Sequence, residues 1–172
     1  KVVESLRLDK VAQRLSALIG KPVNKLNSVV GPDVTEAVAN AKPGEIIMLE
    51  NVRFLKEEKT GSEELAKQLA ALADVYVDDA FATAHRPDTS VAGVPQFLPS
   101  AAGFLLQKEI DVLETVTTSA KKPFIAILGG AKVSDKIGLI KNLLTKTDAV
   151  LIGGGYGCGA VGIRTSRLTE HR

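Results

Sequence analysis

Apolar positions recur along this chain in two alternating patterns, one with helical spacing and one of short unbroken runs. Spacing of three and four residues predicts a helix from Leu8 that ends at Gly20, because glycine readily takes the left-handed conformation of a helix C-terminus. The same spacing predicts four further helices, which begin near Pro32, Leu65, Phe104 and Ile137. Short apolar runs, typical of buried strands, occupy residues 23–26, 45–50, 75–77, 124–128 and 149–152. Strands that alternate with helices in this way indicate βαβ units, a Rossmann-like α/β fold with a mostly parallel sheet.

The alternation stops between residues 80 and 102. Pro87, Pro95, Pro99 and Gly93 predict a long irregular connection there, and connections of this length in compact domains are usually functional or disordered. The helix expected over residues 104–118 follows this connection and lies between two βα regions. That helix can therefore belong to either region or join two domains, and the pattern alone leaves both open.

Composition narrows the class of protein. A chain of 172 residues is long enough for one full domain or pieces of two, and 45% hydrophobic with 24% charged residues is ordinary for a soluble globular protein. The net charge of +2 has no basic block behind it and argues neither for nor against nucleic acid. The single cysteine, Cys158, excludes an internal disulfide framework and suits a reducing compartment. No apolar run reaches ~18 residues and residues 1–8 lack a signal-peptide pattern, so we expect a cytoplasmic location without a membrane span.

The run at residues 124–128 leads into a stretch with the layout of an anion site. Two glycines, Gly129 and Gly130, predict a tight turn after the strand and leave room for a ligand close to the backbone. Ser134 can cap the following helix, whose apolar stripe faces the sheet. A strand, a glycine turn and a helix N-terminus together form the place where an α/β protein binds an anion.

Lys132 and Lys136 lie beside that predicted helix N-terminus. The N-terminus of a helix carries partial positive charge, so lysine near the first turn is unfavourable unless an anion offsets it. Asp135 offsets part of this charge, and a bound phosphate would offset more. The alternative, which this window leaves equally open, is that both lysines point into water. The window does not match a Walker A loop, because the required Gly-Lys-Ser/Thr is absent.

Two arginines follow other predicted strands. In a parallel sheet, ligands lie beyond the carboxyl ends of the strands, where Arg53 and Arg86 are both expected. Each guanidinium offers a planar fork of donors that suits phosphate or carboxylate, so the two could converge on one anion. The alternative, given equal weight, is that each arginine pairs with a neighbouring carboxylate such as Glu57 or Asp88.

Other polar residues carry less specific signals. His85 alone is more often a packed or hydrogen-bonded histidine than a catalytic base. Asp78 and Asp79 are adjacent and would face opposite sides of a strand, so we interpret them as structural and expect no metal site. Residues 157–162 fit G-x-G-x-x-G, but only ~10 residues follow, too few for the supporting helix and the acidic partner of a dinucleotide site. A dinucleotide-binding oxidoreductase is therefore a distant alternative.

Several segments, taken together, resemble the phosphoglycerate kinase family. They include Leu-Glu-Asn-Val-Arg-Phe, Ala-His-Arg and Ile-Leu-Gly-Gly-Ala-Lys-Val-Ser-Asp-Lys-Ile. In order, the matching segments are residues 49–54, 57–59, 72–81, 84–86, 101–105, 126–137 and 151–155. The resemblance covers about residues 1–155. The run His-Arg-Pro-Asp at residues 85–88 departs from the family's commoner His-Arg-Ala-His.

Members of that family have two α/β domains joined by a helix and hinge. They transfer a phosphoryl group between 1,3-bisphosphoglycerate and ADP with Mg2+, a glycolytic step that gives 3-phosphoglycerate and ATP. The resemblance implies that Arg53 and Arg86 belong to the basic patch that holds the phosphoglycerate. It implies that Lys132 is the catalytic lysine near the transferred phosphoryl group, and that the nucleotide contacts are Gly130, Ala131, Lys132 and Lys136. Such chemistry depends on positioning and fixed positive charge.

The resemblance also suggests how the chain divides. We expect residues 1–102 to be a partial N-terminal phosphoglycerate-binding domain, 103–121 the connecting helix and hinge, and 122–155 the start of a nucleotide-binding domain. Residues 156–172 do not resemble the family. Family segments of the sheet and of both substrate sites are not in this sequence, so we expect an incomplete sheet and hypothesise that these residues alone are inactive. The alternative is a non-catalytic piece that binds anions or self-associates through exposed sheet edges, whereas the parent enzyme is expected to be a monomer.

Overall fold

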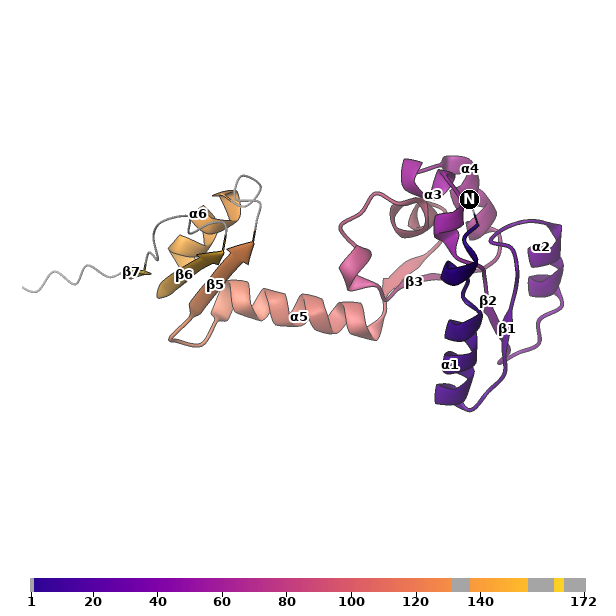
Figure 1. Ribbon diagram of the computed structural model, residues 1–172, viewed down its shortest axis with the longest axis horizontal. Helices are drawn as coiled ribbons and strands as arrows, with labels where there is room; N and C mark the ends of the chain where they lie inside the picture. The colour runs from indigo at the N-terminus through magenta and orange to yellow at the C-terminus, as the bar shows by residue number, and fades with distance from the viewer. Residues whose placement is uncertain (1, 131–136, 155–162, 166–172) are drawn as a thin grey trace, which may run out of the picture. The chain divides into compact units, whose positions relative to one another are not determined.

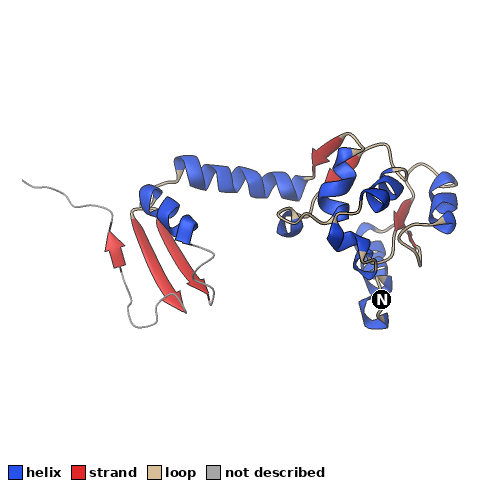
Figure 2. Ribbon diagram, turned by 90° about the horizontal axis from the view of Figure 1, so that it is seen from above, coloured by secondary structure: helices blue, strands red, loops and turns tan. Residues whose placement is uncertain are grey.

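The computed structural model describes residues 2–130, 137–154 and 163–165, which divide into two compact units, Lys1–Lys108 (unit 1) and Glu109–Arg172 (unit 2) (Figures 1 and 2). The described α-helices are α1 (Asp9–Ile19), α2 (Pro32–Ala39), α3 (Glu57–Thr60), α4 (Glu63–Ala70), α5 (Phe104–Ser119) and α6 (Ile137–Lys146). The described strands are β1 (Val23–Lys25), β2 (Ile46–Met48), β3 (Tyr76–Asp78), β4 (Ser100–Ala102), β5 (Ile125–Gly130), β6 (Ala149–Gly154) and β7 (Ile163–Thr165).

The first sheet of unit 1 pairs β1 with β2 in parallel, with Lys25 opposite Met48. The connection between them contains α2, which accepts Pro32 at its first position because an N–H there would have no partner within the helix. Helix α1 packs on β1 and ends at Gly20, whose φ of 66° is the left-handed conformation that favours glycine. The predicted end of this helix and the positions of both strands are confirmed.

The second sheet of unit 1 pairs β3 with β4, also in parallel. Strand β4 contradicts the prediction that residues 80–102 form an irregular connection throughout. The same region contains the 3-10 helices η3 (Phe81–Thr83) and η5 (Val94–Gln96) and the π-helix η4 (Thr89–Gly93). The Ser-Ala-Ala sequence of β4 carries no strand signal, and pairing across the sheet holds it: Tyr76 N–H donates to Pro99 O at 2.9 Å, and Gly103 N–H donates to Asp78 O at 2.7 Å.

One part of the core of unit 1 lies where α4 packs on η4 and η5. Leu65 and Ala66 of α4 and Val94 of η5 are all buried. Gly93 permits this close approach, since a Cβ at that position would lie 3.1 Å from the Cβ of Ala66. Ser62 begins α4 as a capping residue, because its Oγ accepts a hydrogen bond from Leu65 N–H at 3.3 Å. This packing anchors the π-helix that follows the sequence run at residues 85–88.

Helix α5 begins in unit 1 and continues into unit 2. Its first turn is capped by Asp79, whose Oδ1 accepts hydrogen bonds from the backbone N–H groups of Leu105 at 2.7 Å and Leu106 at 3.0 Å. Asp78 accepts one from Ala80 N–H at 2.9 Å. Both aspartates therefore hold backbone in place, which is the structural role that the sequence predicts for them.

Unit 2 contains a sheet in which β5 and β6 are parallel and β7 is antiparallel to β6. Helix α6 follows β5 along the chain and packs on β6. Asp148 fastens the start of the sheet, because its Oδ2 accepts a hydrogen bond from Phe124 N–H at 2.8 Å. Strand β7 is not predicted by the sequence pattern and makes this sheet mixed. Ser134, the predicted helix cap, lies outside the described residues.

Strand β5 extends through Gly129 and Gly130, so the prediction of a tight turn at these glycines is wrong. They pair with Gly153 and Gly154 at the end of β6. Hydrogen bonds between strands involve only the backbone, so glycine continues a strand wherever a partner strand continues beside it. The carboxyl ends of β5 and β6 therefore form a stretch of sheet without side chains.

These elements make an α/β protein with small parallel sheets, which confirms the predicted fold class. Some apolar side chains in or beside the strands are exposed, with Val75 and Val77 each 56% exposed and Ile127 78% exposed. Within the described part of the chain, no helix is both long enough and apolar enough to cross a membrane.

Candidate functional site

The site begins at the carboxyl end of β2, where Glu50 is almost fully buried, with a side chain only 3% exposed. Four donors surround its carboxylate. Oε2 accepts hydrogen bonds from Lys25 Nζ at 2.7 Å and Arg7 Nη1 at 3.0 Å. Oε1 accepts from the backbone N–H groups of Asn51 at 2.8 Å and Leu8 at 3.2 Å. This network joins the segment before α1, strand β1 and the end of β2.

Hydrogen bonds and ion pairs within the network favour the charged forms of its side chains. Burial by itself raises the pKa of the Glu50 carboxyl, but hydrogen bonds from the four donors, led by Lys25, outweigh it and lower the pKa from its ordinary 4.5 to about 2. The hydrogen bond to Glu50 also raises the pKa of Lys25. The pKa of Arg7 is raised first by its hydrogen bond to Glu4 and second by that to Glu50. The side chains of Glu50, Lys25 and Arg7 are therefore all ionised at neutral pH.

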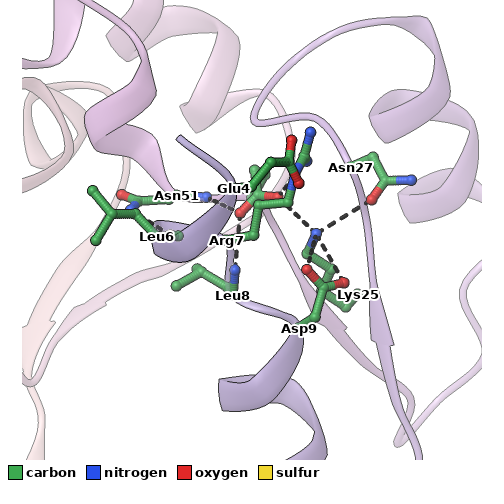
Figure 3. Close-up of polar contacts among 9 residues, drawn as sticks. Glu4, Leu6, Arg7, Leu8, Asp9, Lys25, Asn27 and Asn51 are labelled. Carbon is green, nitrogen blue, oxygen red and sulfur yellow. Dashed lines mark hydrogen bonds and ion pairs between the residues drawn. The ribbon is translucent and has the colours of Figure 1, made fainter. Parts of the chain in front are cut away.

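Asn51 connects the hydrogen-bond network of Glu50 to the backbone of Arg53. The Asn51 side chain donates from Nδ2 to Leu6 O at 3.0 Å (Figure 3). Its Oδ1 accepts a hydrogen bond from Arg53 N–H, also at 3.0 Å. The second of these bonds caps the short 3-10 helix η2 (Val52–Phe54). The backbone that bears Arg53 is thus fixed to the N-terminal segment and, through Glu50, to β1.

The Arg53 side chain forms an ion pair with Asp88, with Nη2 and Oδ2 2.7 Å apart. Of the two alternatives that the sequence leaves open for Arg53, the structure therefore shows a neighbouring carboxylate as partner, and that carboxylate is Asp88. The Asp88 side chain is 10% exposed and that of Arg53 is 33% exposed. One edge of the guanidinium therefore contacts Asp88, while the Arg53 side chain as a whole still reaches the surface.

The residues after Asp88 are held from two sides. The buried carboxylate of Glu58 accepts hydrogen bonds from Ser90 N–H at 3.0 Å and Ser90 Oγ at 2.6 Å. Thr89 Oγ1 donates to Glu57 O at 2.7 Å. From the side of β3, the Tyr76 hydroxyl donates to Ser90 O at 2.9 Å. Residues 88–90 are therefore fastened along the segment that runs from Arg53 to α3.

Arg86 lies two residues before Asp88 and is exposed, as is His85. Consecutive Cα atoms are ~3.8 Å apart, so the Cα of Arg86 lies within about 8 Å of that of Asp88. Its backbone N–H donates to Thr83 O at 2.9 Å. The pair between Asp88 and Arg53 therefore brings the segment that bears Arg86 to Arg53, from a distant part of the sequence.

The residues expected on the nucleotide side are described only in part. Gly130 is the last residue of β5 and lies opposite Gly154. Ala131, Lys132 and Lys136 lie outside the described residues. Among the residues that are described, no cluster of three or more histidine, cysteine or acidic side chains could hold a metal ion.

Sequence reasoning missed Glu50 and Asn51 as parts of this site. A signal for them existed, because an acidic residue directly follows the apolar run of a buried strand. A charge at such a position needs partners, since an unpaired buried carboxylate is costly. The partners themselves, Lys25 and Arg7, follow no local pattern.

The fold and this site define a class: an α/β protein that presents arginines beyond the carboxyl ends of parallel strands. The family model described as "Phosphoglycerate kinase" matches residues 1–160, and the chain belongs to that family. It is 57% identical over 152 residues to the phosphoglycerate kinase of Dictyoglomus turgidum, covering 88% of this chain and 38% of that protein. It is 54% identical over 153 residues to the chloroplastic phosphoglycerate kinase of Volvox carteri, covering 88% of this chain and 33% of that protein.

Solved structures of phosphoglycerate kinases are also similar to this chain. The crystal structure of phosphoglycerate kinase from Pyrococcus horikoshii OT3 matches with a TM-score of 0.77 at 37% identity, covering 86% of this chain and 39% of that one. The structure of phosphoglycerate kinase from Coxiella burnetii matches with a TM-score of 0.75 at 40% identity. The chain thus spans well under half the length of the relatives it matches.

Proposed function

We propose that the protein to which this chain belongs transfers a phosphoryl group between 1,3-bisphosphoglycerate and MgADP. The bond between phosphorus and the acyl oxygen breaks, a bond from phosphorus to a β-phosphate oxygen of ADP forms, and 3-phosphoglycerate and ATP result. Membership of the phosphoglycerate kinase family supports this reaction. The observation that carries it is the meeting of Arg53 with the segment that bears Arg86, at the carboxyl ends of β2 and β3. A cytoplasmic location is part of the same proposal.

In this proposal Arg53 and Arg86 bind the acid substrate. Phosphoryl transfer needs little covalent chemistry from the protein, and its rate depends on alignment and on fixed positive charge around the transferred group. Arginine suits this role because its planar fork of donors matches a phosphate or carboxylate. Arg53 is well prepared for it, since the backbone on which it sits is fixed by Asn51 and Glu50.

The nucleotide is proposed to bind beyond β5 and β6. The paired glycines there leave the backbone bare, so a phosphate can approach it closely. By resemblance, Gly130 and Ala131 lie beside the nucleotide, Lys136 binds its phosphates, and Lys132 stabilises the charge of the transferred phosphoryl group. Mg2+ commonly binds through substrate phosphates and few protein ligands, so it would arrive with the nucleotide.

We assign the binding of the two substrates to different parts of the chain. Residues 1–102 are proposed to bind the phosphoglycerate, 103–121 to connect, and 122–155 to begin the nucleotide-binding part. The ion pair of Arg53 and the segment of Arg86 both lie within unit 1, and the glycine pairs lie within unit 2, which supports this assignment. We further propose that the 172-residue chain on its own does not catalyse turnover, and ATP formation by the pure chain would contradict this.

The test is a coupled assay on the full-length protein, with intact mass recorded for each preparation. Arg53→Met removes the guanidinium and keeps much of the aliphatic stem. We expect it to raise the KM for 3-phosphoglycerate at least roughly tenfold, in line with the loss of one charged hydrogen-bonding partner. Arg14→Met is the matched control, because Arg14 is an exposed arginine of α1 that lies 39 positions before Arg53 in the sequence. Equal KM values for the two variants would remove Arg53 from the acid site.

A second candidate is a chain that binds anions without catalysis and associates with itself. The exposed apolar residues Val75, Val77 and Ile127 favour it, because unpaired strand edges with apolar neighbours promote association. Sedimentation velocity over a range of concentrations tests the self-association that this second candidate requires. Association that increases with concentration supports it, whereas a monomer at every concentration excludes self-association of the chain.

A further inference from the structure

We propose that Asp88 sets the anion affinity of the Arg53 site by acting as an internal anion that a bound substrate must share with Arg53. The carboxylate already occupies one edge of the guanidinium, through the contact of 2.7 Å between Oδ2 and Nη2. The inference rests on the proposed function for the identity of the ligand, but not for the presence of an anion site. It gives an acidic residue a role opposite to that of the arginines around it.

The backbone of Asp88 cannot easily move away. Immediately after it, Thr89 donates to Glu57 O, and Ser90 is held by Glu58 on one side and by Tyr76 on the other. Thr89 is fully buried, and its side chain is therefore enclosed by the protein. A flexible surface acid would swing aside when an anion arrives, whereas an acid fixed in this way stays beside the guanidinium.

The guanidinium still has donors for a ligand. Arginine carries five N–H donors in a fixed plane, and the pair with Asp88 uses one nitrogen, Nη2. The Arg53 side chain is 33% exposed, so its other donors can meet a phosphate or carboxylate from solvent. An anion bound there would lie on the order of 6 Å from the Asp88 carboxylate, across the width of the guanidinium, where two negative charges repel appreciably.

Two effects of removing the charge compete. Asp88→Asn removes this repulsion, which favours binding of an anion. It also weakens the contact that orients Arg53, which opposes binding. The asparagine Oδ1 can still accept a hydrogen bond from Nη2, so most of the orientation is retained while the whole charge is lost. The change in charge therefore dominates, and we expect tighter binding.

Asp88 is suited to this test because its ion pair is with one identified cation. Within the described part of the chain, the ion pair of Asp88 is with Arg53, and the exposed His85 and Arg86 form none.

The experiment titrates the 172-residue chain with 3-phosphoglycerate and, separately, with pyrophosphate, by calorimetry at low salt. Asp88→Asn is expected to lower the Kd for both probes roughly tenfold. The matched control is Asp74→Asn, which removes an equal charge from an exposed aspartate and is expected to change Kd less than about twofold. In the double variant with Arg53→Met, the gain from Asp88→Asn should disappear. A gain in affinity is a result that mere structural damage does not produce.

Three results would overturn the proposal: an unchanged or higher Kd in Asp88→Asn, a gain that persists without Arg53, or no binding of either probe by any variant. Asp88→Ser serves as a second uncharged variant if Asp88→Asn proves unfolded by circular dichroism, and the same expectations apply to it. Failure of the proposed function has a different signature. In that case Asp88→Asn tightens pyrophosphate binding while 3-phosphoglycerate does not bind at all.

Discussion

Replacement of Glu50 by glutamine should disrupt the first sheet of unit 1. All four groups around the carboxylate are donors: Arg7 and Lys25 meet Oε2, and the N–H groups of Leu8 and Asn51 meet Oε1. A glutamine side chain replaces one of the two carboxylate oxygens with an NH2 group, which is a donor. Whichever way the amide is turned, this NH2 group would face two other donors. The substitution also leaves Lys25, whose side chain is 8% exposed, without its closest anionic partner.

The magnitude follows from the pKa. Lowering the pKa of Glu50 from 4.5 to about 2 corresponds to roughly 3 kcal/mol of stability at neutral pH, at ~1.4 kcal/mol per pH unit. Breaking one partner out of a buried ion pair costs a similar amount, ~3–5 kcal/mol. We therefore expect Glu50→Gln to destabilise the pairing of β1 with β2 by at least roughly 3 kcal/mol.

Native-state hydrogen exchange measures this locally. The amide of Leu26 donates to Met48 O at 2.8 Å, and that of Glu50 donates to Ser28 O at 3.1 Å, so both report on the first sheet. At pH 7 we expect their protection to fall on the order of a hundredfold in Glu50→Gln. Glu63→Gln is the control, because Glu63 also meets a lysine at 2.7 Å but its side chain is 72% exposed. If the two variants show equal protection at Leu26, the reasoning is wrong.

The same variant gives a pH test. Since folding lowers the pKa of Glu50, its ionised form contributes stability above pH 4.5, and that contribution is lost as the pH falls from 4.5 toward 2. The difference in protection between the natural chain and Glu50→Gln should therefore be constant above pH 5 and shrink below it. A difference that grows on acidification would contradict the assignment.

Two further substitutions test the supports of the site and of α5. Ser90→Ala removes the 2.6 Å hydrogen bond from Ser90 Oγ to the buried Glu58 carboxylate and should lower the free energy of unfolding by ~1–3 kcal/mol. We expect a lower urea midpoint. An unchanged midpoint would mean that the hydrogen bond from the backbone N–H of Ser90 is enough to satisfy Glu58. Asp79→Ala leaves the N–H groups of Leu105 and Leu106 without their acceptor and should destabilise α5 by ~1 kcal/mol. We expect faster amide exchange only in the first turn of α5. Exchange that accelerates evenly along the helix would argue against a capping role for Asp79.

Local signals identify most of the helices and strands. Helix α1 has apolar residues at intervals of three and four and a glycine at its end, and Gly20 takes the left-handed conformation that this position requires. The apolar runs of β2 and β6 are long enough to mark strands without any knowledge of their partners. The failures are β4 and the glycines of β5. Small residues and glycine carry no strand preference of their own, so a partner strand decides their conformation.

The candidate site divides in the same way. Arg53 can be singled out from sequence because it follows a buried strand, and Asp88 can be named among its possible partners. Which carboxylate it meets depends on how the segment after Arg86 folds back. That segment is placed by Glu58 and Tyr76, which belong to different elements.

The sequence by itself determined the α/β class and the residue types available for binding anions, because these depend on spacing and composition along the chain. The resemblance of its segments to phosphoglycerate kinases indicated the family. The tertiary structure alone decided that Glu50 is held by Arg7 and Lys25, and that Arg53 shares its charge with Asp88. Contacts between residues far apart in sequence form only when several elements pack at once. No local pattern encodes the distance of 2.7 Å that couples an arginine to an acid two segments away.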